Sequence, residues 1–153
     1  MAGVVSYIVI CPVAGQPMGS VDSVVVIAGS GLDGDRYSTG NGTWNKDKAG
    51  SRQVSFINIR SFNGTGFTPA DSRRNIVVNC MELMTLINKT FMIGDVKFRG
   101  VKYCSPCDRP DNLAVKNSGK DGFVDKFCER GGLLAEVLVG GKISVNDVIT
   151  VLK

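Results

Sequence analysis

Short runs of β-branched and aromatic residues recur along the chain, separated by glycine, proline, asparagine and serine. Runs of about four to eight such residues between turn-forming residues are typical of β-strands. The pattern predicts strands over Val4–Ile10, Val21–Ala28, Arg52–Ile59, Ile76–Val78, Leu133–Val139 and Val148–Leu152. One further run, Phe91–Phe98, is interrupted by Gly94 and Asp95, and it predicts a hairpin with a tight turn at that point.

Apolar residues at helical spacing are much rarer. They predict one short helix over Met81–Ile87 and a second over Asp121–Arg130, where Gly131 provides the stop signal. Numerous strands, few helices and no alternation of the two predict a mainly β barrel with two or three short helices. No linker or internal repeat divides the sequence, so residues 1–153 are expected to form a single domain.

A glycine-rich stretch follows the second predicted strand. Gly29, Gly31 and Gly34 fit the dinucleotide-binding pattern G-x-G-x-x-G, which requires a helix to begin at that point. The residues that follow, Asp35–Gly42, are of the loop-forming type. We therefore reject dinucleotide binding, and we expect the glycines to supply positive φ angles in tight turns.

Composition limits the chemistry that the chain can perform. The sequence of 153 residues contains no histidine, which excludes Cys–His and Ser–His catalytic pairs and zinc sites with a histidine ligand. A thiolate is therefore the strongest candidate for a nucleophile. The five cysteines are irregularly spaced, which is unlike a secreted disulfide framework and indicates a reducing, cytoplasmic environment.

Charge and hydropathy restrict the partners. The net charge of +4 is mild and no basic run is interleaved with aromatic residues, so we expect an anionic small molecule rather than nucleic acid. Residues Met1–Val13 are apolar but lack the basic start of a signal peptide. No run reaches the ~18 apolar residues of a membrane span, so no membrane association is expected.

The stretch Val101–Pro110 holds the strongest candidates for chemistry, because Cys104 and Cys107 lie three positions apart between Lys102 and Arg109. Positive flanking side chains favour the thiolate form. The motif alone leaves open half of a zinc site, a thioredoxin-like dithiol and an inert turn. The other cysteines form no second pair for a four-cysteine zinc site, and the prolines favour a loop over the helix that a thioredoxin-like motif needs.

Two adjacent arginines, Arg73 and Arg74, precede the predicted strand Ile76–Val78. Arginines at such a position are usually solvated. The alternative is that one of them turns inward and presents its planar fork to a phosphate or carboxylate.

Eight short segments in a fixed order carry a resemblance to a known family. They are Pro12–Met18, Gly31–Tyr37, Gly40–Trp44, Arg52–Val54, Arg73–Val77, Cys104–Cys107, Arg130–Leu133 and Gly141–Ile143. Together they resemble a small stand-alone MOSC domain, the module related to the C-terminal domain of molybdenum cofactor sulfurases. The resemblance covers essentially the whole chain.

The resemblance implies a β-barrel close to the pyruvate-kinase barrel type, with a pocket at one end. The hallmark cysteine of the family corresponds to Cys107, which would carry sulfur as a persulfide or bind molybdenum. Cys104 would then either resolve the persulfide as a disulfide or be a bystander. The anionic group of a molybdopterin cofactor would be bound by Arg36, Arg73, Arg74 and Asn75.

Three functions follow as alternatives from the resemblance. The first is a sulfur carrier or a molybdenum-cofactor-binding protein that receives sulfur from a donor protein. The second is a molybdenum-dependent reductase component for N-hydroxylated compounds, which would need an electron-transfer partner because this chain has no iron–sulfur ligand set. The third is a non-catalytic module that holds an anionic ligand or partner through Arg36, Arg73 and Arg74.

The sequence departs from the small relatives at three positions in its last third. Those relatives usually have an arginine where Leu134 stands, often a histidine where Glu129 stands, and a glycine where Asn146 stands. The loss of a cation at position 134 would weaken anion binding if that position faces the pocket.

Overall fold

The structure is a computed structural model that describes residues 3–11, 18–39, 53–79, 82–104 and 131–152. Its strands are β1 (Gly3–Ile10), β2 (Gly19–Val21), β3 (Ser23–Ile27), β4 (Gly31–Leu32), β5 (Val54–Asn58), β6 (Ile76–Asn79), β7 (Thr90–Ile93), β8 (Val96–Tyr103), β9 (Leu133–Val139), β10 (Gly141–Ser144) and β11 (Val148–Val151). The helical elements are α1 (Arg36–Thr39) and the 3₁₀ turns η1 (Ile59–Phe62), η2 (Ala70–Ser72) and η3 (Leu83–Leu86).

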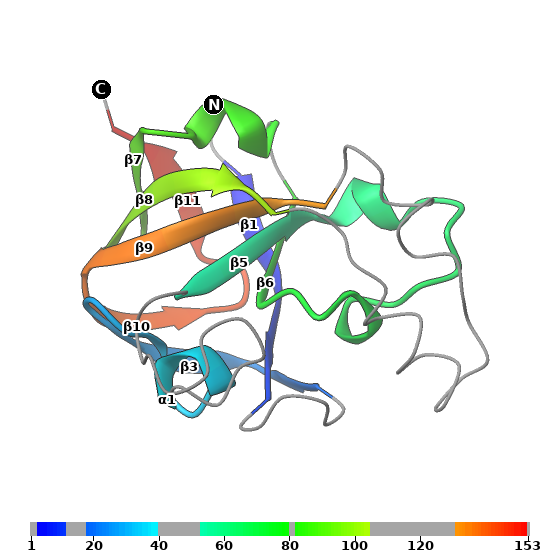
Figure 1. Ribbon diagram of the computed structural model, residues 1–153, viewed down its shortest axis with the longest axis horizontal. Coiled ribbons are helices and arrows are strands. Elements are labelled where there is room, and N and C mark those ends of the chain that lie inside the picture. The colour runs from blue at the N-terminus through cyan, green and yellow to red at the C-terminus, as the bar shows by residue number, and fades with distance from the viewer. Residues whose placement is uncertain (1–2, 12–17, 40–52, 80–81, 105–130, 153) are drawn as a thin grey trace.

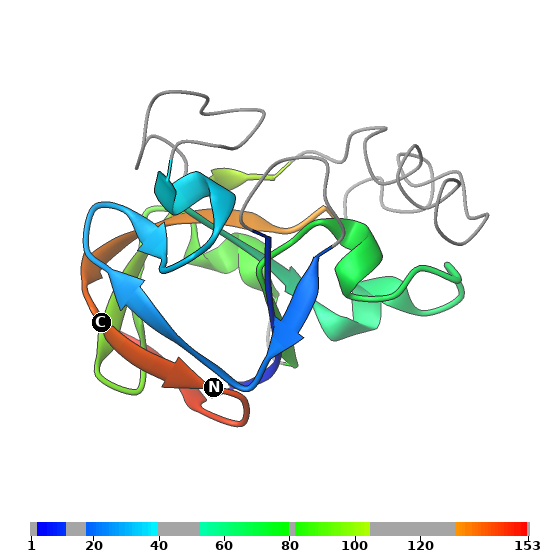
Figure 2. The same cartoon turned by 90° about the horizontal axis from the view of Figure 1, so that it is seen from below.

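Seven strands close into a barrel. Their order is β11-β7-β8-β9-β5-β6-β1, and β1 pairs with β11 to complete the ring, while β2 extends the sheet from β1. The neighbours are antiparallel except for the parallel pair β5 and β6. A small sheet of order β10-β3-β4 lies beside the ring (Figures 1 and 2). The predicted mainly β barrel with few and short helices is confirmed.

The predicted elements agree with the observed ones in most places. The expected hairpin is formed by β7 and β8 around Gly94, which has a φ of 56°. The helix expected over Met81–Ile87 is wrong in type, because the chain forms only the 3₁₀ turn η3. The helix predicted over Asp121–Arg130 lies outside the described residues. None of the helices in the described ranges is long and apolar enough to cross a membrane.

The glycine-rich stretch forms turns, as expected. Gly29, Gly31 and Gly34 all have positive φ angles, of 71°, 135° and 82°. A side chain at Gly31 would meet the carbonyl oxygen of Gln53. The helix that follows, α1, is a single turn of four residues, so the structure supports rejection of the dinucleotide-binding pattern.

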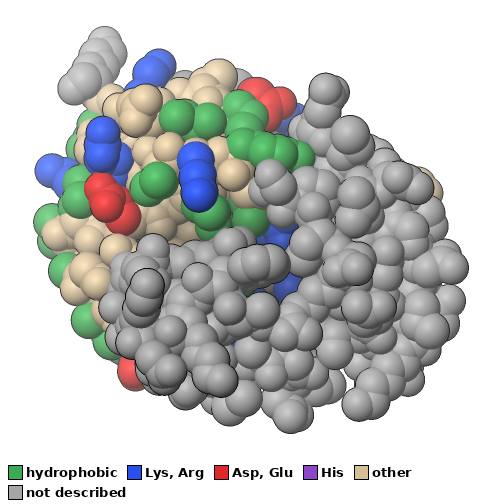
Figure 3. Space-filling model, viewed as in Figure 1, with side chains coloured by type: hydrophobic (Ala, Val, Ile, Leu, Met, Phe, Trp, Pro, Cys, Tyr) green, Lys and Arg blue, Asp and Glu red, His purple; other side chains and the backbone are tan. Residues whose placement is uncertain are grey.

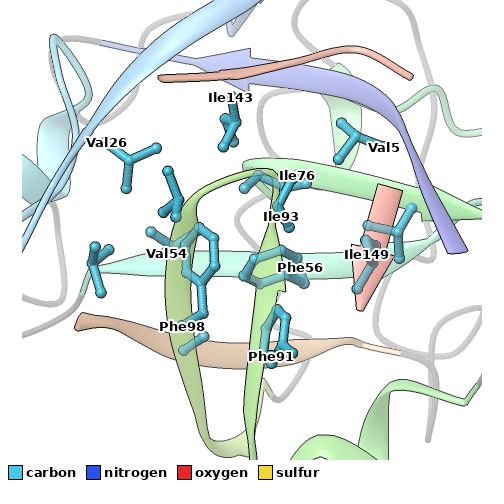
Figure 4. Close-up of a cluster of buried hydrophobic side chains, with 14 of the residues drawn as sticks. Val5, Val26, Val54, Phe56, Ile76, Phe91, Ile93, Phe98, Ile143 and Ile149 are labelled. Carbon is cyan, nitrogen blue, oxygen red and sulfur yellow. The ribbon is translucent and has the colours of Figure 1, made fainter. Parts of the chain in front are cut away.

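Three phenylalanines form the centre of the barrel core. Phe56 of β5 meets Phe91 of β7 and Phe98 of β8 edge to face, with ring centroids 5.5 and 5.3 Å apart. Phe91 and Phe98 stack on each other with their centroids 5.5 Å apart. Aliphatic side chains from β1, β3, β6, β10 and β11 point towards these rings (Figure 4). Each such aromatic pair adds about 0.5–1.5 kcal/mol beyond its buried area, so the rings join β5 to β7 and β8.

One departure from the relatives has a local explanation. Asn146 lies in the turn between β10 and β11 with a φ of 76°. Glycine adopts this left-handed region freely, and asparagine tolerates it better than most residues. The asparagine of this chain can therefore occupy the same turn as the glycine of the relatives.

The close approach of Gly132 to β5 leads to a stability prediction. A side chain at Gly132, which has a φ of 104°, would meet the carbonyl oxygen of Phe56. Gly29 also has a positive φ, but nothing lies within 4 Å of its would-be side chain. We expect Gly29→Ala to cost about 1–2 kcal/mol from backbone strain alone, and Gly132→Ala to cost roughly 3 kcal/mol or more because the backbone must also shift. Urea unfolding of both variants measures the difference, and equal losses would contradict the packing of Gly132 against β5.

Candidate functional site

The segment before β6 turns both of its arginines away from solvent. Arg73 directly follows the turn η2 and adopts the left-handed conformation, with φ 64° and ψ 18°. Arg73 and Arg74 are 7% and 4% exposed, and Asn75 is fully buried. Both arginines are therefore buried rather than solvated, while the binding of a phosphate or carboxylate by either of them stays a prediction.

Arg74 binds the backbone at three places. Its Nε donates to the carbonyl oxygen of Gly131 at 2.7 Å, Nη1 donates to that of Ser72 at 3.2 Å, and Nη2 donates to that of Cys104 at 3.4 Å. Cys104 and Gly131 are the last and first described residues on either side of residues 105–130. The guanidinium group thus connects the two ends of the segment that contains Cys107.

Further hydrogen bonds hold the same two ends together. The backbone amide of Cys104 donates to the carbonyl oxygen of Gly132 at 2.9 Å. The amide of Gly131 donates to the hydroxyl group of Tyr103 at 3.3 Å. These bonds continue the pairing of β8 with β9 past the ends of both strands, so the geometry of the two ends is fixed by the barrel.

Asn75 joins three strands. Its side-chain oxygen accepts from both the amide and the hydroxyl group of Ser55, each at 3.1 Å, and its Nδ2 donates to the carbonyl oxygen of Val9 at 3.3 Å. Asn75 therefore connects the start of β6 to β5 and β1. Its two side-chain polar atoms both bind protein groups in this arrangement, so binding of a cofactor by Asn75 stays a prediction.

Arg36 and Asp35 form a buried ion pair at the start of α1. Arg36 Nη1 lies 3.2 Å from Asp35 Oδ1, and its Nη2 donates to the carbonyl oxygen of Arg73 at 3.2 Å. Asp35 also accepts from the backbone amides of Cys11 and Tyr37, at 3.0 and 3.3 Å. The Arg36 guanidinium lies 4.4 Å from the centroid of the Tyr37 ring. The carboxylate thereby positions Arg36 beside the segment that leads into β6.

A second buried guanidinium lies next to Arg36. Burial lowers the pKa of Arg73 from its ordinary value, and the nearby charge of Arg36 lowers it further, whereas Cys11 and Tyr37 raise it. Cys11, which is fully buried, is a hydrogen-bond partner of the Arg73 side chain. We refer to Arg36 and Arg73 together as the buried arginine pair. An anion bound beside this pair would reduce the repulsion between its two like charges.

Of the candidate thiols, the structure describes Cys104 and Cys11. Cys104 is 1% exposed and Cys11 is fully buried. Cys107 and its basic neighbour Arg109 lie outside the described residues, and so do Cys80, Cys128 and Glu129. Within the described ranges, no group of three or more Cys, Asp or Glu side chains could hold a metal ion. The role of Cys107 as a nucleophile or metal ligand stays a prediction.

Leu134 stands in the wall of the barrel. It belongs to β9, is buried, and pairs in register with Ser55 of β5 and Lys102 of β8. Ser55 in turn binds Asn75. Leu134 in β9 is thus separated from the residues that precede β6 by one strand, β5.

Three residues of this site were not predicted from the sequence. Asp35, Tyr37 and Cys11 surround the buried arginine pair, but only their neighbour Arg36 was singled out. An acid directly before an arginine in a glycine-rich turn is a usable signal for Asp35. No comparable signal exists for Cys11, because its contact with Arg73 spans two distant segments of the chain.

The charges on the outer surface are arranged differently from those inside. On the face that includes β8 and β9, basic and acidic side chains are interspersed (Figure 3). Arg99 and Glu136, for example, form an ion pair across these strands with a separation of 3.5 Å. In the part of this face that the structure describes, charges of opposite sign lie near each other, whereas the buried arginine pair brings two like charges together.

The sequence pattern of the MOSC domain matches residues 49–150, a range that contains Arg73, Arg74, Cys104 and Cys107. The chain belongs to the MOSC domain family. None of the curated proteins matches the sequence.

Solved structures with the same fold come from several bacteria. The YuaD protein of Bacillus subtilis is 17% identical, with a TM-score of 0.81, and the match covers 99% of this chain and 96% of that one. YiiM from Escherichia coli is 15% identical, with a TM-score of 0.66, and the match covers all of this chain and 70% of that one. YiiM from Geobacillus stearothermophilus is 15% identical, with a TM-score of 0.64 and coverage of 99% and 75%. At these identities the likeness shows the barrel fold of this MOSC domain.

The three hydrogen bonds of Arg74 lead to a second stability prediction. Arg74→Ala would leave three carbonyl groups without their donor in a buried place, and we expect a loss of about 3–5 kcal/mol in the free energy of unfolding. Arg74→Lys should recover little of it, because an ammonium group cannot reproduce the planar fork. Arg99→Ala, in an exposed ion pair, serves as the control with a loss of about 0–1 kcal/mol. Equal unfolding midpoints for the Arg74 and Arg99 variants would show that the hydrogen bonds of Arg74 do not stabilise the fold.

Proposed function

We propose that this MOSC domain is a sulfur carrier in which Cys107 holds sulfur as a persulfide next to a site for an anionic ligand. The observation that supports it is the placement of two consecutive arginines. Arg74 binds both ends of the segment that contains Cys107, while Arg73 lies with Arg36 in the buried arginine pair. The adjacent residues Arg73 and Arg74 thus connect the buried arginine pair to the ends of the segment that contains Cys107.

The transfer step needs no external oxidant. The Cys107 thiolate attacks the outer sulfur of a donor persulfide, a new S–S bond forms, and the S–S bond of the donor breaks. The donor leaves as a thiolate, and its former outer sulfur remains on Cys107. Lys102, an exposed residue of β8, and Arg109 would favour the attacking thiolate form. The low exposure of Cys104 favours its role as a bystander over that of a resolving thiol.

The family also implies a molybdenum–pterin cofactor, and the described residues fit its anionic part. The buried arginine pair offers positive charge in a place of low dielectric, which suits a phosphate group. Arg36 and Arg73 would hold that group, with Cys107 as the metal ligand. When bound, the cofactor would supply oxygen-atom or electron transfer at the metal. The residues of the chain would orient it and neutralise its charge.

The carrier role is tested by mass spectrometry. After incubation with a cysteine desulfurase and cysteine, we expect a mass increase of one sulfur atom on the peptide that contains Cys107. Cys107→Ser should abolish this increase, whereas Cys104→Ser should leave it unchanged because Cys104 is buried. The absence of added sulfur from the wild-type protein, or its transfer to Cys104 instead, would remove the proposed carrier role.

The anion site is tested separately by thermal unfolding in inorganic phosphate. At constant ionic strength, we expect phosphate to raise the melting temperature of the wild-type protein relative to chloride, because ligand binding to the folded state stabilises it. A phosphate concentration of ten times the dissociation constant should stabilise the folded protein by about 1.4 kcal/mol. Arg73→Gln should lose this shift relative to its own baseline in chloride, and Arg99→Gln should keep it. An undiminished shift in Arg73→Gln would exclude the buried arginine pair as the site.

A further inference from the structure

A cavity separate from the buried arginine pair lies at the end of β5. Its volume is about 390 Å³, and its lining includes Asn58 at the end of β5, Arg60 and Ser61 of η1, Glu82 and Leu83 next to and within η3, and Gly132. This volume falls within the range of roughly 300–1,000 Å³ that is usual for small-molecule sites. Arg36, Arg73 and Arg74 are not among its lining residues.

The inner wall combines hydrogen-bonding groups with an apolar surface. Asn58 and Ser61 are buried polar residues, and Leu83 is a buried apolar residue from η3. Gly132 contributes bare backbone, since its close approach to Phe56 admits no side chain. The wall thus offers an amide, a hydroxyl group and a small apolar area to a compact polar ligand.

The rim carries one charge of each sign. Arg60 Nη2 lies 3.9 Å from Glu82 Oε2, and the two side chains are 53% and 65% exposed. An ion pair that is this exposed contributes about 0–1 kcal/mol, so a ligand can displace it at small cost. The other carboxylate oxygen of Glu82 accepts from the backbone amide of Met84 at 3.4 Å, which holds the carboxylate at the start of η3.

We propose that this cavity binds a free α-amino acid. The ligand carboxylate lies against the Arg60 guanidinium, its ammonium group lies against Glu82, and its side chain enters the cavity towards Asn58 and Ser61. Both charges of the ligand are required, because a simple anion is repelled by Glu82 and a simple cation is repelled by Arg60. The site is independent of the proposed sulfur-carrier role and of the anion bound by the buried arginine pair.

Calorimetric titration of the full chain with each of the 20 common L-α-amino acids tests the proposal. We expect at least one of them to bind with a dissociation constant below about 1 mM. Its N-acetyl derivative, which lacks the ammonium charge, and its carboxamide, which lacks the carboxylate charge, should each bind about tenfold more weakly or worse. These comparisons need no change to the protein.

Two neutral variants of the rim locate the site. Arg60→Gln and Glu82→Gln should each weaken binding about tenfold or more, and Glu82→Gln keeps an oxygen for the amide of Met84. For the Glu82→Gln variant, N-acetylation of the ligand should cause no further loss of affinity, because the carboxylate that binds the ligand ammonium group is already absent. Arg99→Gln and Glu136→Gln, which alter the exposed pair across β8 and β9, should bind as the wild type does.

Two outcomes would overturn the proposal. One is that no amino acid in the panel binds. The other is that an amino acid binds but Arg60→Gln and Glu82→Gln retain wild-type affinity. Urea unfolding of each variant shows that the comparison is made between folded proteins, and the exposure of both side chains predicts changes of no more than about 1 kcal/mol.

Discussion

The hydrogen bonds of the Arg74 guanidinium are the constraint on which the candidate site depends. A cation withdrawn from water costs several kcal/mol unless its hydrogen-bonding groups are satisfied. Here the satisfying groups are carbonyl oxygens from three separate parts of the chain, at Ser72, Cys104 and Gly131. The buried guanidinium group keeps these hydrogen bonds only while the three segments hold their relative positions. The barrel supplies this condition, because β6, β8 and β9 are placed by the closed ring of strands.

The interior near β6 therefore contains two kinds of buried cation. Arg74 binds neutral backbone groups and fixes distances between segments. Arg73 and Arg36 lie close together, and burial and mutual repulsion depress the pKa of Arg73. The first kind stabilises a geometry, while the second creates a local excess of positive charge that favours a negatively charged guest. The adjacent residues Arg73 and Arg74 thus have different physical roles.

The sequence predicted the barrel well because its strands are marked by local features. The β-branched runs and the Gly94-Asp95 turn needed only their neighbours to be recognised. The helix expected near Leu83 and Leu86 became a 3₁₀ turn. Their spacing of three residues suits a helix with three residues per turn, and both are buried. Spacing over so short a segment does not distinguish the two helix types.

The site was less predictable because its contacts are not local. The partners of Arg74 at Cys104 and Gly131 lie 30 and 57 positions away in the sequence. For Arg73 and Arg74, general statistics favour exposure, and the family resemblance pointed towards a pocket without deciding between the two. The role of Asn75 between β1, β5 and β6 likewise depends on pairings that only the closed sheet brings together.

The left-handed backbone of Arg73 has a consequence of its own. In an extended strand, consecutive side chains emerge on opposite faces of one sheet, and both faces would have to accept a cation. A single left-handed residue just ahead of β6 breaks that alternation before the strand begins. This conformation costs about 1–2 kcal/mol for a residue with a side chain, and the chain bears that cost at the residue whose guanidinium lies beside Arg36. Glycine would adopt the same conformation without strain, but it would remove one of the two charges of the buried arginine pair.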